Sequence, residues 1–509
     1  MEKIYKMILR SLISKNLLLT NLMGQLNDEI LNHDVKGITS NSKQVQSGYI
    51  FIAIKGKKIN GENFIEEAKN KGAFLILSEN KNITTNNCLT ITNTSARLVY
   101  SVLLSAFYKK QPNIIIGVTG TNGKTSTVEF CRQIWVFAGW KAASMGTLGT
   151  KIGTNQNEIV YNSSENSLTT FEPSELYKNL STLSKNNVSH LALEASSHGL
   201  DQFRLNGINF SGAVFTNLSH DHLDYHGNIE NYFTSKKRLF NEILQKQCAV
   251  AINIDDDFGK RLYEELETDK HMVLTFGKNK KAAVNIKSIT HNNQTLRMSV
   301  EYKKTVFNST LGMIGKFQAY NVLASASICI ALGMDPNFVF RALPYLKPAR
   351  GRMEIVPSKN SNSTVIIDYA HTPEALRSVL SFLKEMKIKN GKLITLFGCG
   401  GDRDKDKRKL MGNIAHKYSD TVIITDDNPR NENPAKIRSD ILSGSPSAIE
   451  ISDRNKAIKH AVSILSENDF LLIAGKGHET LQTIGSETLP FDDYAVAREA
   501  LNNSNMTEI

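Results

Sequence analysis

Short apolar runs alternate with amphipathic stretches along most of this chain. One apolar run, Ile114–Val118, leads into the turn Thr119–Gly123. Apolar residues then recur at helical spacing, at Val128, Cys131, Ile134, Trp135 and Ala138. The pattern predicts a strand, a tight loop and a helix that ends near Gly139, with the apolar stripe in the core.

The last third of the chain repeats an apolar run and a helical stretch four times. The four predicted strands are Thr364–Ile367, Leu393–Phe397, Thr421–Ile424 and Phe470–Ala474. Each is followed by a polar cluster, namely Asp368–Pro373, Gly398–Arg403, Asp426–Arg430 and Gly475–Glu479. In a doubly wound parallel sheet the carboxyl ends of strands share one crevice, so the clusters are predicted to converge on one ligand. The alternative is four unrelated polar turns.

The first part of the chain has the pattern of a small α/β domain. Strands are predicted at Tyr49–Ile54, Phe74–Leu77 and Cys88–Thr92, and helices at Phe64–Lys71 and Ala96–Lys109. The segment Gly37–Lys43 is interpreted as a polar turn before a strand. With this domain at 1–110, we predict a central domain at 111–348 and a third domain at 349–509.

Two further strands are predicted in the central domain. His190–Leu193 ends in Glu194, and Ala213–Phe215 leads into a segment with His220, His222 and His226. The stretch that follows, Tyr232–Phe240, predicts an amphipathic helix whose basic face is expected to be solvated.

Composition narrows the possible partners. The 509 residues carry 61 Lys and Arg against 50 Asp and Glu, a net charge of +11, which suits anionic ligands. The basic residues form no block, so nucleic acid is not indicated. Five scattered cysteines indicate a reducing cytoplasm. The N-terminus predicts a helix and no signal peptide, and no apolar run is long enough to span a bilayer.

The loop after the first central strand has the chemistry of a phosphate-binding loop. Its glycines allow the backbone to approach a triphosphate at a helix N-terminus, Lys124 can neutralise the outer phosphates, and Thr125 can reach Mg²⁺. The strict spacing would place a glycine at Val118, so this is a variant loop. The predicted nucleotide-binding residues are Gly120, Thr121, Asn122, Gly123, Lys124, Thr125 and Ser126. An ordinary glycine turn before a helix is the alternative.

Two neighbouring strand ends carry candidate metal ligands. Glu194 stands where such folds place a Mg²⁺ ligand, with a helix-capping role as the alternative. Three histidines and two aspartates within His220–His226 also suggest metal ligation. Zinc lacks a fourth soft ligand at a usual spacing, so an oxygen-rich Mg²⁺ site with one imidazole fits better.

Taken together, these motifs resemble those of the Mur ligase family. The motifs stand in family order over nearly the whole chain, at Gly120–Thr125, Glu194–Gly199, Asn217–Gly227, Gly351–Glu354 and Asp368–Pro373. The resemblance implies a three-domain α/β architecture. A small N-terminal α/β domain would bind the UDP end of a substrate, a central P-loop parallel-sheet ATPase domain would bind ATP, and a C-terminal Rossmann-like domain would bind an amino acid.

The resemblance also implies roles for individual residues. Contacts to a UDP-muramoyl-peptide are expected from Ser42, Thr169, Thr170, Ser196, Gln202 and Arg204. Contacts to ATP are expected from Asn321, Arg352, Asp368 and His371, in addition to the phosphate-binding loop. Catalytic or Mg²⁺-binding roles are expected for Lys124, Thr125, Glu194, His222 and Lys236. Lys236 matches the family lysine that reacts with CO₂, and its carbamate would supply an anionic oxygen group for a second Mg²⁺.

The third domain indicates which amino acid is added. Asp427, Asn428, Pro429 and Arg430 match the motif of the diaminopimelate-adding members of the family. Arg403 and Arg430 can pair with carboxylates, and Glu479, with Gly475 beside it, can accept a hydrogen bond from a distal ammonium. Since lysine lacks the second carboxylate, a site that leaves Arg430 unpaired should reject it.

The first domain departs from the family pattern. Asn41 and Lys43 stand where Asp and Arg are usual, and Asn60–Glu62 replaces an Asp-Gly-His pattern. These departures affect the expected uridine contacts and leave the catalytic motifs intact.

The resulting hypothesis is a cytoplasmic, ATP-dependent, amide-forming ligase of peptidoglycan precursor synthesis. It would join meso-diaminopimelate to UDP-N-acetylmuramoyl-L-Ala-D-Glu through an acyl phosphate, as a monomer that spans no membrane. Two alternatives remain: a folylpolyglutamate synthetase, which shares the loop and two-domain core, and a P-loop motor or switch, which would hydrolyse ATP without an amino acid.

Overall fold

The fold is described from a computed structural model of the chain. It describes residues 7–14, 19–20, 24, 26–56, 59–80, 88–91, 94–155, 157–162, 168–266, 271–292, 294–357, 363–387 and 390–503. The chain divides into two compact units. The first consists of Met1–Lys124 and Trp135–Leu274, and the second of Thr125–Ile134 and Thr275–Ile509.

The first unit begins with a four-stranded parallel sheet. Its strands, in spatial order, are β1 (Gly37–Thr39), β2 (Tyr49–Ala53), β3 (Ala73–Ser78) and β4 (Cys88–Thr90). The prediction of a polar turn at Gly37–Lys43 was wrong for its first three residues, which pair with β2. A three-residue strand is too short to show an alternating pattern, and its pairing is set by the longer neighbour.

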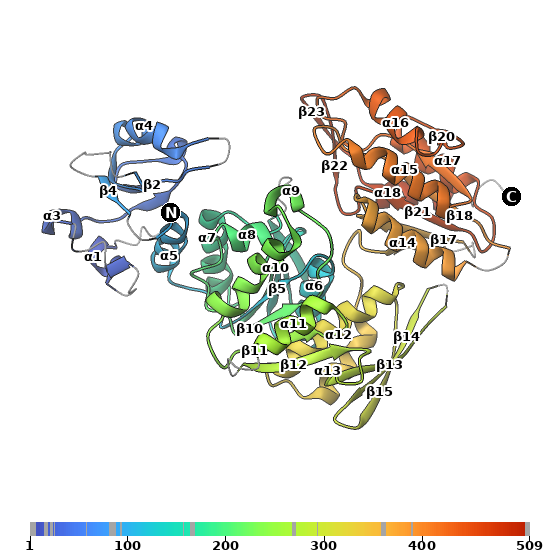
Figure 1. Ribbon diagram of the computed structural model, residues 1–509, viewed down its shortest axis with the longest axis horizontal. Coiled ribbons are helices and arrows are strands. Elements are labelled where there is room, and N and C mark those ends of the chain that lie inside the picture. The colour runs from blue at the N-terminus through green and yellow to red at the C-terminus, as the bar shows by residue number, and fades with distance from the viewer. Residues whose placement is uncertain are drawn as a thin grey trace. The chain divides into compact units, whose positions relative to one another are not determined.

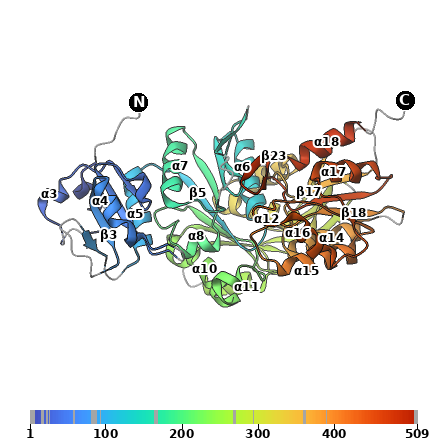
Figure 2. The ribbon, with the colours of Figure 1, turned by 90° about the horizontal axis from the view of Figure 1, so that it is seen from above.

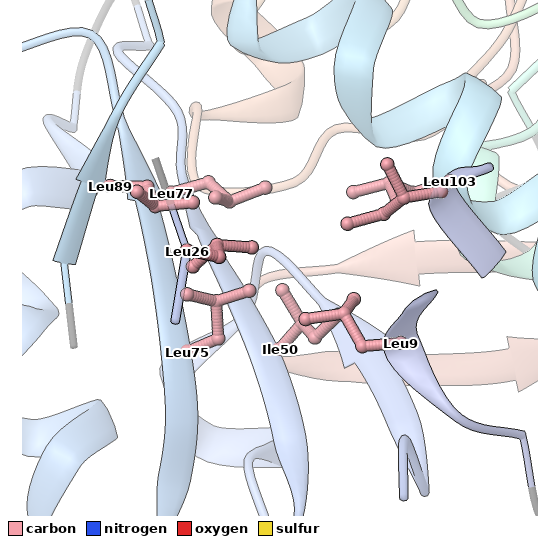
Figure 3. Close-up of a pocket in the computed structure, with 8 residues that line it drawn as sticks. Leu9, Leu26, Ile50, Leu75, Leu77, Leu89 and Leu103 are labelled. Carbon is pink, nitrogen blue, oxygen red and sulfur yellow. The ribbon is translucent and has the colours of Figure 1, made fainter. Parts of the chain in front are cut away.

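Helices cover both faces of this sheet (Figure 1). Alternate residues of β2 and β3 pack on α4 (Ile65–Asn70), with Phe51 and Ile76 in that core. The intervening residues face α1 (Leu9–Ile13) and α5 (Ala96–Tyr108). Figure 3 shows this second side, where Ile50, Leu75, Leu9 and Leu103 point into one small gap. Only apolar side chains line the gap, so it belongs to the hydrophobic core and offers a ligand no polar group.

A second sheet fills the rest of the first unit. Its spatial order is β11 (Ala249–Asn253), β10 (Gly212–Phe215), β5 (Ile114–Thr119), β9 (His190–Glu194), β6 (Ala142–Gly146), β7 (Gly149–Gly153) and β8 (Glu158–Asn162). The pairings from β11 to β6 that the structure describes are parallel, and β7 and β8 add an antiparallel edge. The carboxyl ends of β5, β9 and β10 therefore lie side by side, with the register Val118 opposite both Glu194 and Val214.

Helices that follow these strands carry the predicted motifs. They are α6 (Lys124–Phe137), α7 (Pro173–Lys185), α8 (Ser197–Asp201), α9 (Leu223–His226), α10 (Ile229–Arg238) and α11 (Asp257–Leu266). The predicted core stripe of α6 is largely confirmed, since Val128, Cys131, Ile134 and Trp135 are buried. A π-helical turn, Leu239–Ile243, extends α10, and a four-residue helix, α3 (Asp28–Leu31), lies near the N-terminus.

The second unit contains an antiparallel meander and two helices. The meander consists of β13 (Val284–His291), β14 (Leu296–Tyr302) and β15 (Thr305–Leu311). The strand β12 (Met272–Gly277), which straddles the division between the units, pairs with β13 in parallel. The helices are α12 (Lys316–Ala331) and α13 (Pro336–Ala342). Most of α12 is buried, which explains why its sequence shows no polar face.

A six-stranded sheet forms the rest of the second unit. Its order is β16 (Glu354–Val356), β17 (Thr364–Asp368), β21 (Phe470–Ala474), β18 (Leu393–Phe397), β19 (Thr421–Ile424) and β20 (Ile449–Glu450). Only β16 is antiparallel to its neighbour. The four predicted strands are confirmed to within one residue, and they are parallel neighbours, so their carboxyl ends share one edge.

Helices lie on both faces of this sheet, as Figure 2 shows. One face packs on α14 (Pro373–Met386), α15 (Asp406–Tyr418) and α16 (Pro434–Leu442), and the other on α17 (Arg454–Ser463) and α18 (Asp493–Asn503). Alternate residues of one strand serve the two cores, as with Ile366 and Ile367 of β17. A strand buried on both faces is apolar throughout, which is why these strands were recognisable in the sequence.

A two-stranded hairpin, β22 (Leu481–Ile484) and β23 (Glu487–Pro490), follows β21 and was not predicted. Cys131, Cys248, Cys329 and Cys399 are free thiols, while the side chain of Cys88 is outside the described part. None of the described helices has the length and apolar character that a membrane span requires.

Candidate active site

The predicted phosphate-binding loop connects β5 to α6 and is braced by the end of β10. The N–H of Thr121 donates to the carbonyl of Asn217 at 2.8 Å, and the N–H of Asn122 donates to its side-chain oxygen at 3.0 Å. Gly120 has φ +147°, and a Cβ at this position would lie 1.9 Å from Oγ1 of Thr216. Only glycine fits there, so the tight turn depends on Gly120.

Lys124 begins α6 and folds back over the loop. Its Nζ donates to the carbonyl oxygens of Gly120, at 3.0 Å, and Thr121, at 2.8 Å. Thr125 and Ser126 follow within the first turn of the helix and are buried. The first turn of a helix presents unsatisfied N–H groups and a partial positive charge, which is the arrangement that holds phosphate groups.

Glu194 ends β9, beside the phosphate-binding loop. Its carboxylate is 2 % exposed and accepts hydrogen bonds from Thr147, through the backbone N–H at 2.8 Å and through Oγ1 at 3.2 Å. Thr147, after β6, was not predicted as a site residue. Its role is visible only in the structure, because β6 and β9 are neighbours although 47 residues separate the two side chains.

His222 precedes α9 and adopts a left-handed conformation with φ +53°. Its ring lies edge-on to that of His198, with centroids 4.9 Å apart, and 6.2 Å from the ring of Tyr232. Burial lowers the pKa of His198 to about 4, so this imidazole is neutral at physiological pH. A positive φ is costly for a non-glycine residue and is commonest at functional sites.

Lys236 of α10 lies inside the protein. The prediction of a solvated basic face was wrong at this position, because Lys236 is 1 % exposed. Its Nζ donates to the carbonyl of Gly120 at 2.8 Å and lies 4.5 Å from the ring centroid of Tyr232. No carboxylate within the described residues forms an ion pair with it. Burial, and then the charge of Lys124, lowers the pKa of Lys236 well below its ordinary value.

Five of the six predicted contacts to the UDP substrate form one hydrogen-bonded group. Oγ1 of Thr170 donates to the carbonyl of Glu194 and accepts from the N–H of Ser196. Arg204 donates to the carbonyl of Thr170 at 2.7 Å and to Oε1 of Gln202 at 2.7 Å. Thr169 is linked to the group through Thr147. The sixth, Ser42, lies in the N-terminal part and donates to Glu67 at 2.8 Å.

Two of the N-terminal residues that differ from the family pattern, Asn41 and Asn60, cap local turns. The side chain of Asn41 accepts from the N–H of Lys43 at 3.0 Å, and that of Asn60 accepts from the N–H of Glu62 at 3.2 Å. Both asparagines cap short 3₁₀ turns.

In the second unit, the residues predicted to contact ATP lie along two segments. Asn321 donates to Gln318 at 3.1 Å, and Gln318 donates to the carbonyl of Arg352 at 3.2 Å. Asp368 accepts from the N–H of Met353 at 2.8 Å, and burial raises its pKa to about 6. Nδ1 of His371 lies 2.9 Å from the carbonyl of Tyr369.

The four polar clusters of the third domain meet at the carboxyl edge of the six-stranded sheet. Gly475 donates its N–H to the carbonyl of Asp368 at 3.2 Å. A Cβ on Gly401 would lie 1.8 Å from the carbonyl oxygen of Pro429, so the second and third clusters touch backbone to backbone. Arg403 is exposed in the same loop as Gly401. The four clusters therefore lie at one edge of the sheet, and their convergence on one ligand stays a prediction.

Arg430 is held in a strained conformation. Its φ is +51°, and the hairpin strand β22 pairs with its backbone, since Arg430 donates to Thr483 and accepts from Gly485. Its Nη1 donates to the carbonyl of Gly401 at 2.8 Å. The position of the guanidinium is therefore fixed by the backbone pairing of Arg430 as well as by its side-chain contact with Gly401.

Asn428 and Glu479 form a second hydrogen-bonded group at this edge together with Lys476, which was not predicted. Nδ2 of Asn428 donates to Oε2 of Glu479 at 2.8 Å, and Nζ of Lys476 donates to the same oxygen at 3.3 Å. Asp427 is buried beside Gly475. The crevice thus offers arginines for carboxylates and a carboxylate for an ammonium group.

The donor chemistry near the phosphate-binding loop was compared with the needs of a metal ion. Among the described residues, no group of three or more His, Cys, Asp or Glu side chains is arranged to hold a metal. A closed zinc site needs such a group. Mg²⁺ is usually held by one or two carboxylates together with water and substrate phosphates, so the carboxylate of Glu194 beside the loop fits Mg²⁺.

Comparisons with known proteins cover the whole architecture. Residues 34–114 match the Mur ligase family catalytic domain, 118–329 the Mur ligase middle domain, and 351–477 the Mur ligase glutamate ligase domain. A relative from Brucella melitensis named UDP-N-acetylmuramoyl-L-alanyl-D-glutamate–2,6-diaminopimelate ligase is 41 % identical over 469 residues, covering 92 % of this chain and 94 % of the relative.

Solved structures agree with these matches. A structure with the same ligase name has a TM-score of 0.71 and 30 % identity, and covers 98 % of this chain and 99 % of its own. The MurF ligase from Thermotoga maritima in complex with ADP has a TM-score of 0.59 at 20 % identity, covering 92 % and 97 %. The similarity to the MurF structure shows a shared fold and nothing about substrates.

Proposed function

Since the chain belongs to the Mur ligase family, we propose that it is the ATP-dependent ligase that adds meso-2,6-diaminopimelate to UDP-N-acetylmuramoyl-L-Ala-D-Glu. The product is an amide on the D-glutamate of a peptidoglycan precursor. One observation carries the choice of amino acid: Arg430 and the pair Asn428–Glu479 lie at the same edge of the six-stranded sheet. Together they can recognise a carboxylate and an ammonium group.

The proposed division of labour follows three domains at 1–110, 111–348 and 349–509. The three family matches, at 34–114, 118–329 and 351–477, support this division. The first domain would bind the UDP end through Ser42, the second ATP and the muramoyl-peptide, and the third the amino acid.

The proposed reaction has two chemical steps. The γ-phosphoryl group of ATP passes to the D-Glu carboxylate, giving ADP and an acyl phosphate. The amine of diaminopimelate then attacks the acyl carbon, loses a proton and displaces phosphate, which leaves an amide. Lys124 and the N–H groups of the first turn of α6 are proposed to stabilise the charge on the transferred phosphoryl group. Asn321, Arg352, Asp368 and His371 are proposed to bind the remainder of the nucleotide.

Mg²⁺ is proposed to bind beside the loop, through Thr125, Glu194, His222 and a carbamate of Lys236. When bound, it neutralises phosphate charge as a Lewis acid. The carbamate forms when the neutral amine of Lys236 attacks CO₂ and releases one proton. The support is geometric: the amine is enclosed, forms no ion pair with a described carboxylate, and lies 2.8 Å from the loop carbonyl of Gly120.

The remaining substrate contacts are proposed in the same way. Thr169, Thr170, Ser196, Gln202 and Arg204 form a polar group next to Glu194 that suits the muramoyl-peptide. Arg403, Asp427, Asn428, Pro429, Arg430, Gly475 and Glu479 are proposed to bind diaminopimelate. We further propose a cytoplasmic monomer that binds no nucleic acid.

A substrate-swap assay tests the proposal. Phosphate release should require ATP, UDP-N-acetylmuramoyl-L-Ala-D-Glu and meso-diaminopimelate together. Replacing diaminopimelate by L-lysine should abolish most of the turnover, because Arg430 would lose its carboxylate partner. Brisk turnover with L-lysine would contradict the proposed specificity. Addition of glutamate to a folate would favour a folylpolyglutamate synthetase, and ATP hydrolysis without any amino acid would favour a motor or switch.

A further inference from the structure

Lys476 is a buried cation at the edge of the proposed amino-acid site. Its side chain is 0 % exposed, and its ammonium group has three protons to donate. The structure provides three acceptors: the carbonyl of Leu481 at 2.6 Å, Oδ1 of Asn428 at 3.1 Å and Oε2 of Glu479 at 3.3 Å. Every proton therefore has a partner, and the ammonium has no spare donor for a substrate.

The orientation of the Asn428 amide follows from Lys476. Oδ1 of Asn428 accepts from Nζ of Lys476 and from the N–H of Thr483, at 3.0 Å. Because both donors require an oxygen at that position, the amide nitrogen must point the other way, toward Glu479. Nδ2 then donates to Oε2 of Glu479 at 2.8 Å.

Glu479 is thereby held by one oxygen only. Oε2 accepts from both Asn428 and Lys476, whereas Oε1 accepts no hydrogen bond from the described part of the chain. The Glu479 side chain is 33 % exposed, so it reaches the crevice. Burial, and then the carboxylate of Asp427, raises the pKa of Glu479, while Lys476 lowers it. Lys476 thus favours the ionised form that can bind an ammonium group.

Lys476 also connects Asn428 and Glu479 to the hairpin. Its bond to Leu481 fixes the start of β22, and the next residues of β22 hold the third cluster, since Gln482 donates to the carbonyl of Asp427 at 2.7 Å. Lys476 therefore links the loop that carries Glu479 to the loop that carries Asn428, in addition to the contacts that β22 makes with Asp427 and Asn428.

We infer that Lys476 is a positioning residue that holds Glu479, directly and through Asn428, for the distal ammonium group of the amino-acid substrate. The inference rests on the proposed function. Lys476 itself touches no substrate, and its effect is confined to recognition of that ammonium.

The test compares two amino acids in the full-length protein. meso-Diaminopimelate carries the distal ammonium, whereas 2-aminopimelate has the same carbon chain and both carboxylates but lacks it. In Lys476→Met, kcat/KM for diaminopimelate should fall at least tenfold, while that for 2-aminopimelate should change less than threefold. The ratio of kcat/KM for diaminopimelate to kcat/KM for 2-aminopimelate should therefore fall by nearly the same factor as kcat/KM for diaminopimelate. KM for ATP should not change.

Controls separate positioning from folding. Lys436→Met removes an exposed lysine of α16 in the same domain and should leave the preference as in the wild type. If Lys476→Met does not accumulate as folded protein, the same comparison is made with Lys476→Gln, which keeps a polar group at the end of the side chain. Equal losses for the two amino acids would mean a merely structural role and would overturn the inference. Failure of the wild type to use diaminopimelate would instead overturn the proposed function.

Discussion

Nζ of Lys236 lies 2.8 Å from the carbonyl oxygen of Gly120, so the buried lysine of α10 touches the turn of the phosphate-binding loop directly. The residues come from segments 116 positions apart. The same carbonyl also accepts from Nζ of Lys124 at 3.0 Å, so two amines meet at Gly120. A change in the charge of Lys236 should therefore affect the geometry of the loop.

The first prediction concerns this amine. Lys236→Met should lower kcat by about 100-fold or more, the usual cost of losing one electrostatic contact to a reacting group. Its thermal stability should be maintained, because methionine fills the same buried space without an enclosed polar head. Phosphate release and thermal unfolding measure the two effects.

The neighbouring lysine supplies the control. Lys237 lies next in the chain but pairs with Glu265 at 2.9 Å on a more exposed face, so Lys237→Met should keep wild-type activity. Wild-type activity should also fall in buffer depleted of CO₂ and recover on adding bicarbonate. An unmodified amine in a crystal of the nucleotide complex would argue against the carbamate.

A second prediction concerns the choice of amino acid. Arg430→Ala should lower kcat/KM for diaminopimelate by about 10- to 150-fold, since a hydrogen bond between charged groups contributes about 1.5–3 kcal/mol. Alanine keeps the Cβ, so the strained backbone at φ +51° is unchanged and only the guanidinium is lost. KM for ATP should stay the same.

L-Lysine makes this prediction specific. Because lysine has no distal carboxylate, its low kcat/KM should change little in Arg430→Ala. The ratio of kcat/KM for diaminopimelate to kcat/KM for lysine should therefore fall. Arg377→Ala, at an exposed position of α14, is the matched control. An equal fall in kcat/KM for both amino acids would show that Arg430 supports the fold of the loop and does not bind the distal carboxylate.

The third prediction is a pH dependence of stability. His190 stacks on Trp140, with centroids 4.3 Å apart, and burial lowers its pKa to about 4 from the ordinary 6.5. Between these values the unfolded chain binds a proton that the folded chain does not, so stability is lost as the pH falls from 6.5 toward 4. Between pH 7 and pH 5 the free energy of unfolding should fall by about 1 kcal/mol less in His190→Gln than in the wild type. This difference is smaller than the full pKa shift would give, because the ring is partly exposed to solvent.

Urea unfolding followed by tryptophan fluorescence measures this effect locally. The chain has two tryptophans, and both Trp135 and Trp140 contact the ring of His190. His416→Gln, at an exposed position of α15, should keep the wild-type pH dependence. Identical losses in His190→Gln and in the wild type would contradict the assignment.

The strands of the third domain could be predicted because each is buried on both faces and is therefore apolar throughout. Glu194 and Arg430 could be named because they follow such strands. Lys476 could not, since its burial depends on Leu481 and on Asn428, 48 positions away, and its sequence has the pattern of a polar loop. The prediction of a solvated face was wrong at Lys236 for the same reason, because helical spacing does not reveal which residues pack against a basic side chain.

The last prediction concerns a buried ion pair beneath the amino-acid site. Arg454, the first residue of α17, donates to both carboxylate oxygens of Asp493, the first residue of α18, each at 2.7 Å, and both side chains are 0 % exposed. Arg454 also donates to the carbonyl of Ala474 at 3.0 Å, at the end of β21. Asp493→Asn should lower the free energy of unfolding by about 3–5 kcal/mol, because it leaves a buried charge without its partner.

The same two helices carry an exposed pair that serves as the control. Lys459 and Glu499 lie 3.3 Å apart with side chains 46 % and 56 % exposed, so Lys459→Met should cost less than about 1 kcal/mol. The double variant Arg454→Met with Asp493→Asn should lose less than the sum of its single variants, because no charge then remains buried alone. Urea unfolding followed by circular dichroism gives all four values. Strictly additive losses would mean that the two residues stabilise the helices independently.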